Sequence, residues 1–165
     1  MKKKLFVLIM LIAVVALTGC SKGVKGADGK TTFTCVKKGI ERTSTLSKAK
    51  YTEDVTNQAK LDDNGKLTYY KTEYKYTYDS KEACEEDCSA TKDWNDEINK
   101  NNYAGGHRET TCSCDKKEYK QAYIYDDIPN LASILRSDLT HLNEDNTFKI
   151  DEWVEHYEKY KYNCD

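Results

Sequence analysis

Four cysteines lie close together in the chain, at spacings that could serve three kinds of chemistry. Cys84 and Cys88 are separated by three residues in ACEEDCSA, and Cys112 and Cys114 by one residue in TCSCD. Four thiolates could bind zinc tetrahedrally, a reactive thiol pair could exchange with a disulfide, and oxidised sulfurs would form disulfides. The compartment decides among these, because disulfides persist where no cytosolic thiol pool reduces them.

The N-terminal segment indicates export. Three lysines at positions 2–4 precede an apolar run from Leu5 to Leu17, which is too short for a settled membrane span. The sequence Leu-Thr-Gly-Cys at 17–20 resembles the lipobox of bacterial lipoproteins. This resemblance implies that a diacylglyceryl group is attached to the Cys20 sulfur and that the chain is cleaved before Cys20.

The expected organisation follows from this cleavage site. Residues 1–19 are predicted to be a lipoprotein signal peptide, residues 20–30 the lipidated cysteine with a flexible tether, and residues 31–165 a single extracytoplasmic domain. Two acyl chains anchor a protein stably. We therefore expect the lipid bilayer as a partner through Cys20, a location on the extracytoplasmic face of a bacterial envelope, and no cofactor besides the covalent lipid.

The charge balance excludes one class of partner. The chain has 26 Lys and Arg against 28 Asp and Glu, and the first 19 residues hold three of the lysines and no acid. The expected mature part therefore has 23 basic and 28 acidic residues, a formal charge of −5. A nucleic-acid-binding protein needs a net basic face to displace counterions from phosphates, so we expect no nucleic-acid partner.

Alternating apolar and polar residues predict an α+β fold, an antiparallel sheet with helices packed on one face. Asn64-Gly65 favours a type I′ hairpin turn between two strands. Strands are expected at residues 31–37, within 51–61 and at 67–78. Residues 109–114 and 118–125 are expected to form either one bent strand or a hairpin around residues 115–117.

Three helices are predicted to accompany the sheet. The first has Asp79 as N-cap and Glu82 at the third helical position, as in a capping box, and continues to about Asn101. The second starts near Asp127 with Pro129 in its first turn. The third is capped by Asp151 and carries an apolar stripe of Trp153, Val154, Tyr157 and Tyr160.

The layout of residues 31–165 resembles the YehR-like family of small bacterial lipoproteins. The similar features are Thr34-Cys35 in the first strand, a hairpin at Asn64-Gly65, a tyrosine-bearing strand followed by a helix and further strands, and a last helix leading to Asn163-Cys164. The chain departs from the family in its cysteines 84, 88, 112 and 114. The domain of this family has no established function, so the resemblance implies no catalytic residue.

Export favours disulfides for the six cysteines that follow Cys20, although six cysteines allow 15 pairings. On a helix, Cys84 and Cys88 lie one turn apart, about 6 Å along the axis. On a strand, Cys112 and Cys114 share a face and lie roughly 6.6 Å apart. A helix antiparallel to the strand would match these spacings. The predicted pairs are Cys88–Cys112 and Cys84–Cys114, which leaves Cys35 to join the first strand to the final helix through Cys164.

The metal and redox alternatives stay open but have weaker support. Structural zinc sites usually bring each ligand pair from a C-x2-C knuckle, and neither spacing here matches it. No C-x-x-C motif occurs, although Lys81 could lower the pKa of the Cys84 thiol. The histidines His107, His141 and His156 form no recognised motif.

A tyrosine stripe in the third strand allows two interpretations. Residues 70, 72, 74, 76 and 78 share one strand face, and all but Thr72 are tyrosines. Tyrosines can stack on sugars or anchor peptides. With only three phenylalanines in the chain, we instead expect the stripe to be the inner face of the sheet, covered by the cysteine-bearing helix.

The sequence thus predicts a membrane-anchored envelope lipoprotein that is a non-enzymatic binding or structural module. The alternative is an envelope thiol-redox, metal-binding or hydrolytic protein. No catalytic constellation is visible in the sequence, and no ligand-binding or metal-binding residue is assigned.

Overall fold

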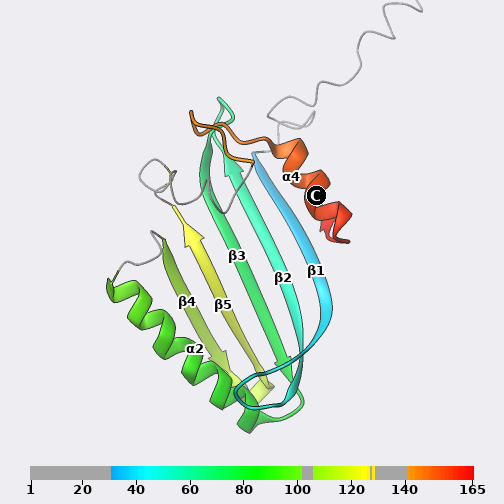
Figure 1. The fold of residues 1–165 in the computed structure, drawn as a ribbon, viewed down its shortest axis with the longest axis vertical. Helices are drawn as coiled ribbons and strands as arrows, with labels where there is room; N and C mark the ends of the chain where they lie inside the picture. Colours follow the sequence, from blue (N-terminus) through cyan, green and yellow to red (C-terminus); the bar gives the residue numbers. More distant parts are fainter. Residues whose placement is uncertain (1–30, 102–105, 127, 129–140) are drawn as a thin grey trace, which may run out of the picture.

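The computed structural model describes residues 31–101, 106–126, 128 and 141–165. This part of the chain forms a single domain with the predicted α+β fold, in which a six-stranded antiparallel sheet carries two α-helices (Figure 1). The strand order is β4-β5-β3-β2-β1-β6. The elements are β1 Thr32–Thr43, β2 Lys50–Leu61, β3 Leu67–Tyr78, α2 Lys81–Asn101, β4 His107–Ser113, the 3-10 turn η1 Cys114–Lys116, β5 Glu118–Tyr125, α4 Ile150–Lys159 and β6 Asn163–Cys164.

The hairpin between β2 and β3 lies where Asn64-Gly65 predicted it, but the prediction of a type I′ turn was wrong. A type I′ turn needs positive φ at both central residues, whereas only Gly65 has a positive φ here, of 79°. The Asp62 side chain accepts hydrogen bonds from the backbone N–H groups of Asn64 at 2.8 Å and Lys66 at 2.9 Å. This Asx-type contact closes a longer loop, with Gly65 in the left-handed region.

Both described helices begin differently from the prediction. The Ser80 hydroxyl accepts a hydrogen bond from the Ala83 N–H at 3.1 Å, so Ser80 and not Asp79 caps α2, and Glu82 is not at the third position. In α4 the N-cap is Lys149 and Asp151 lies inside the first turn, where its negative charge still favours the helix dipole. The helix predicted near residues 127–139 lies outside the described residues.

The helices lie on the same face of the sheet at opposite corners. Figure 1 shows α2 along β4 at one side and α4 beside β1 at the other. Trp153 of α4 is fully buried, whereas Tyr160, expected on the same stripe, is 55% exposed. Among the helices that the structure describes, none has the length and apolarity of a membrane span.

Each helix covers its own part of the core. One cluster surrounds Trp153 and includes Phe33, Tyr70 and Phe148, and the other surrounds Cys84 and Cys88 of α2 with Tyr78 and Tyr119 of the sheet. Between these two clusters lies the central part of the sheet face.

Candidate functional site

The structure joins the six described cysteines in three disulfides. Helix α2 runs antiparallel to β4, so that two cysteines one helical turn apart meet Cys112 near the end of β4 and Cys114 at the start of η1. The Cα atoms are 5.6 Å apart in Cys84–Cys114 and 6.0 Å apart in Cys88–Cys112. These are the two pairs that the helix and strand spacings predicted, and the third disulfide, Cys35–Cys164, is the pair that remained.

The third disulfide connects two strands, not a strand and a helix. Cys164 lies in the short strand β6 directly opposite Cys35 of β1, and their Cα atoms are 4.1 Å apart. The neighbouring residues Thr34 and Asp165 exchange backbone hydrogen bonds at 3.0 and 3.5 Å. The crosslink therefore fixes the end of the chain as an edge strand of the sheet.

The crosslinked sulfurs offer no free thiol in the described part of the chain. Cys84 and Cys88 are fully buried, whereas Cys112 is exposed. Within the described residues, no group of three or more His, Cys, Asp or Glu could hold a metal ion. Cys20, the predicted lipidation site, lies outside the described residues.

Two of the histidines come together although the sequence showed no motif. The rings of His141 and His156 are 5.4 Å apart in an edge-to-face arrangement. Burial and the neighbouring His156 lower the pKa of His141. His107 lies apart from them, 3.5 Å from the Glu109 carboxylate.

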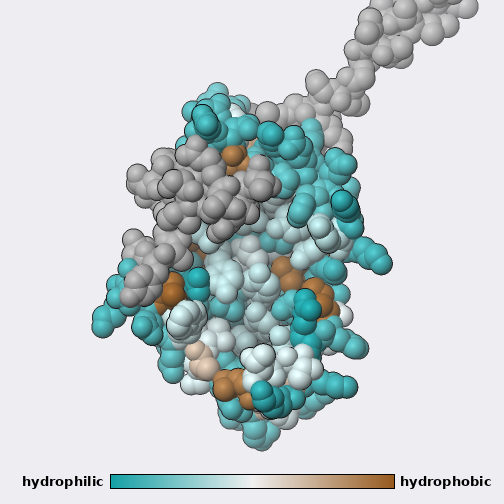
Figure 2. Space-filling view, viewed as in Figure 1, coloured by the Kyte–Doolittle hydropathy of each residue, from teal (hydrophilic) through white to brown (hydrophobic). Residues whose placement is uncertain are grey.

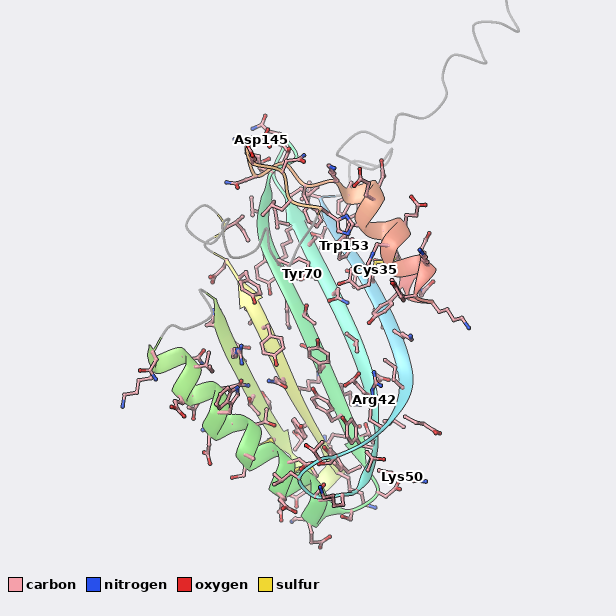
Figure 3. The ribbon with its side chains drawn as sticks, viewed as in Figure 1. Cys35, Arg42, Lys50, Tyr70, Asp145 and Trp153 are labelled. Atoms are coloured by element: carbon pink, nitrogen blue, oxygen red, sulfur yellow. A yellow bond between two sulfur atoms is a disulfide. The ribbon has the colours of Figure 1, made fainter. Side chains whose placement is uncertain are left out.

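Among the elements that the structure describes, the helices cover the tyrosine stripe of β3 only at its ends, so the expectation that α2 covers it was wrong for its middle. Tyr78 is buried under α2, where its hydroxyl donates to Asp87 at 2.6 Å. Tyr70 is buried at the other end, with its ring 6.4 Å from that of Trp153 in α4 (Figure 3). Tyr74 and Tyr76 between them are only half-buried.

The uncovered middle forms a groove that consists of two hollows. The first, of about 480 Å³, lies toward α4, and the second, of about 390 Å³, lies toward α2. Figure 2 shows this central region as pale side chains of intermediate hydropathy, with hydrophilic and a few hydrophobic side chains around it. We call the two hollows together the tyrosine groove. Its lining includes Lys37, Arg42, Tyr51, Glu53, Tyr74, Tyr76, Asp87 and Tyr162.

Ring stacking holds the floor of the groove in place. The rings of Tyr76 and Tyr119, from neighbouring strands, stack with their centroids 4.5 Å apart. Tyr78 stacks on the same Tyr119 at 5.9 Å, and Tyr74 lies parallel to Tyr76 at 6.1 Å. Offset-stacked aromatic pairs are favourable beyond the area they bury, so this floor is preformed.

Several hydroxyls of the groove have no hydrogen-bond partner in the described part of the chain. These belong to Tyr51, Tyr74 and Tyr162, whereas Tyr76 donates to Gln121 Oε1 at 3.4 Å. Burial raises the pKa of Tyr74 to about 12, and it also raises the pKa values of Tyr51 and Tyr162. All three phenols are therefore neutral at physiological pH and can donate or accept a hydrogen bond.

A carboxylate and a guanidinium face each other in the groove. Glu53 of β2 is 12% exposed in its side chain, and its oxygen lies 3.9 Å from Arg42 Nε of β1. Burial raises the pKa of Glu53, and the positive charge of Arg42 partly offsets that rise. Arg42 itself is 56% exposed and lies on the β1 side of the groove (Figure 3).

Asp87 of α2 fixes the end of the groove. Its buried carboxylate accepts hydrogen bonds from the hydroxyls of Ser44 at 2.9 Å, Ser47 at 3.0 Å and Tyr78 at 2.6 Å, and from the Ser47 N–H at 3.3 Å. The loop between β1 and β2 is thereby tied to α2. Two large apolar side chains remain exposed on this rim, Trp94 at 58% and Leu46 at 49%.

Replacing Asp87 with alanine should lower the free energy of unfolding by roughly 2–3 kcal/mol, because three hydroxyl groups and an N–H lose a charged acceptor. Urea unfolding followed by circular dichroism measures this loss. Asp96→Ala is the matched control on the same helix. Asp96 pairs with Lys92 at the surface, so this change should leave the free energy of unfolding nearly unchanged. Equal losses in the two variants would contradict the role given to Asp87.

Of the strands that line the groove, only β3 was predicted from the sequence, through its tyrosine stripe. Tyr119, Gln121 and Tyr123 contribute from β5, and their alternate spacing in EYKQAYIY was a signal that they share a face. The approach of Arg42 to Glu53 depends on the β1–β2 register, which pairs Arg42 with Tyr51 and Ile40 with Glu53 after a bulge. No local sequence signal indicated that register.

Comparisons of this chain with protein-family models, curated proteins and solved structures found no match. The functional assignment therefore rests on the residues of the groove, the crosslinks and the N-terminal motif.

Proposed function

We propose that this protein is a lipid-anchored binding module of the bacterial cell envelope, and that the tyrosine groove is its binding surface. Residues 1–19 act as the signal peptide, Cys20 carries the lipid, and the domain is displayed on the extracytoplasmic side of the membrane. The resemblance to YehR-like lipoproteins agrees with this assignment.

The observation that supports binding most strongly is the half-buried aromatic floor. In this chain 33% of the residues are charged and 11% are aromatic, yet stacked tyrosines line an open groove between α2 and α4. Clefts that combine aromatic rings with a few oriented polar groups are typical ligand sites. A purely structural sheet face would bury these rings under a helix, as happens at Tyr70 and Tyr78.

The disulfides support the extracytoplasmic location. All six described cysteines are paired. Two of the disulfides join α2 to the hairpin that follows it, between cysteines 30 and 24 residues apart in the sequence. Structural disulfides of this kind form and persist in oxidising compartments.

Anchoring is tested by metabolic labelling with an alkyne-bearing fatty acid in a bacterial host. The full-length wild-type chain should incorporate the label, and Cys20→Ala should lose it to background, because the sulfur that carries the lipid is gone. Ser21→Ala is the matched control and should keep the label. Equal labelling of Cys20→Ala, or an unlabelled wild-type chain that keeps residues 1–19 in the cytosol, would contradict the proposal.

A further inference from the structure

We propose that the tyrosine groove binds an oligosaccharide, whose sugar rings lie along β3 between α2 and α4. This inference rests on the proposed function, because it names the ligand class of the same surface.

The lining of the groove matches the chemistry of a sugar chain. A sugar ring has apolar C–H faces that pack against aromatic rings and a rim of hydroxyls that need hydrogen-bond partners. The groove offers the rings of Tyr74 and Tyr76 beside the carboxylate of Glu53 and the guanidinium of Arg42. Such planar charged groups can each bond two neighbouring hydroxyls.

The phenol hydroxyls supply further contacts at the same surface. Those of Tyr51, Tyr74 and Tyr162 have no partner within the described residues, and each lines the groove. Each is neutral at physiological pH, so each can both donate and accept. A polyhydroxyl ligand would satisfy them, whereas an aliphatic ligand would leave them without partners at a cost in free energy.

The shape and the backbone favour a sugar chain over a peptide strand. The two hollows follow each other along β3, and the eight-residue step from Tyr70 to Tyr78 spans about 26 Å. The central strands β2, β3 and β5 are paired on both sides. Their backbone groups are therefore unavailable to add a peptide as a further strand. Recognition in the groove must come from side chains.

The charge of the groove selects among sugar chains. In the hollow toward α4, Lys37 and Arg42 lie with the carboxylate of Glu53, which leaves a net positive charge there. The hollow toward α2 contains the carboxylate of Asp87, which already accepts hydrogen bonds from Ser44, Ser47 and Tyr78. The hollow toward α4 therefore favours a neutral or acidic sugar over a cationic one.

The test is isothermal titration of the chain, expressed at full length in a bacterial host and purified in detergent micelles, with three hexasaccharides. They are β-1,4-linked N-acetylglucosamine, α-1,4-linked galacturonate and β-1,4-linked glucosamine, which are neutral, acidic and cationic. We expect the neutral or the acidic hexamer to bind with a Kd on the order of 0.1 mM. Failure of both at about 5 mM, or binding of the cationic hexamer alone, would overturn the proposal.

Variants locate the binding. Tyr74→Ala should weaken the affinity by roughly tenfold, and Tyr74→Phe, which keeps the ring and loses the hydroxyl, should weaken it less. Lys75→Ala is the matched control on the same strand, because Lys75 points to the opposite face and pairs with Glu118. Affinity unchanged in both Tyr74 variants would contradict the site.

The two proposals fail separately. A chain that carries the fatty-acid label at Cys20 but binds no hexamer retains the envelope assignment and loses the sugar ligand. A chain that binds a hexamer but carries no label retains the ligand and loses the anchor.

Discussion

Replacing both Cys35 and Cys164 with alanine should lower the free energy of unfolding by about 4–5 kcal/mol. The crosslink joins residues 129 positions apart, and the inner disulfides shorten the loop that it closes to roughly 100 residues in the unfolded chain. Releasing that loop increases the entropy of the unfolded state. Because domains are commonly stable by only about 5–15 kcal/mol, the variant should be close to unfolded at 37 °C.

Urea unfolding followed by circular dichroism measures the effect. The matched control replaces Cys88 and Cys112, whose link closes 24 residues. The intact Cys84–Cys114 link still closes nearly the same loop, so the control should lose less stability than the outer pair. A larger loss in the control would show that the chain ends contribute little to the stability of the sheet.

Trp153→Ala should lower the free energy of unfolding by about 3–5 kcal/mol, the usual cost of removing a fully buried tryptophan. The ring is 0% exposed and contacts Tyr70, Phe148 and Tyr157 at centroid distances of 6.4, 6.0 and 5.0 Å. Its loss leaves a cavity between α4 and the sheet, and α4 has no side-chain N-cap to compensate.

The second tryptophan of the chain is the control. Trp94 lies on α2 with 58% of its surface exposed at the rim of the groove, so Trp94→Ala should change the stability only slightly. Chemical unfolding monitored by circular dichroism compares the two variants without relying on tryptophan emission. Equal losses would mean that the α4 cluster is not a main part of the core.

The strands were the easiest elements to predict, because alternation is a direct consequence of strand geometry. β3 occupies residues 67–78 as expected. Of the two alternatives for the following strands, the hairpin at residues 115–117 is the one observed, with Lys117 in the left-handed region. The strand β6 was missed, because two residues are too few to show a pattern and their pairing with β1 depends on the tertiary fold.

Short-range hydrogen bonds caused the errors at element ends. Asp79 and Ser80 are both good N-cap residues, and the sequence alone could not decide that the Ser80 hydroxyl would reach Ala83. Likewise the Asp62 carboxylate, bonded to two backbone N–H groups, overrode the type I′ preference of Asn64-Gly65.

The candidate site was predicted only in part, since it depends on which part of the sheet the helices leave uncovered. The tyrosine stripe was visible in the sequence, and the disulfide spacing correctly placed α2 antiparallel to β4. That placement moves α2 to the β4 side of the sheet and leaves Tyr74 and Tyr76 half-buried. The angle and offset of a helix on a sheet are tertiary properties with no local sequence signal.

A count of free thiols tests the central claim most directly, namely that the chain leaves the reducing interior and its cysteines become crosslinked. Protein purified from the membrane fraction is treated with an alkylating mass tag before and after reduction, and its mass is measured. We predict no tagged cysteine before reduction and six afterwards, with Cys20 blocked by its lipid throughout. Two or more cysteines tagged without reduction, or a product that retains residues 1–19, would contradict the claim.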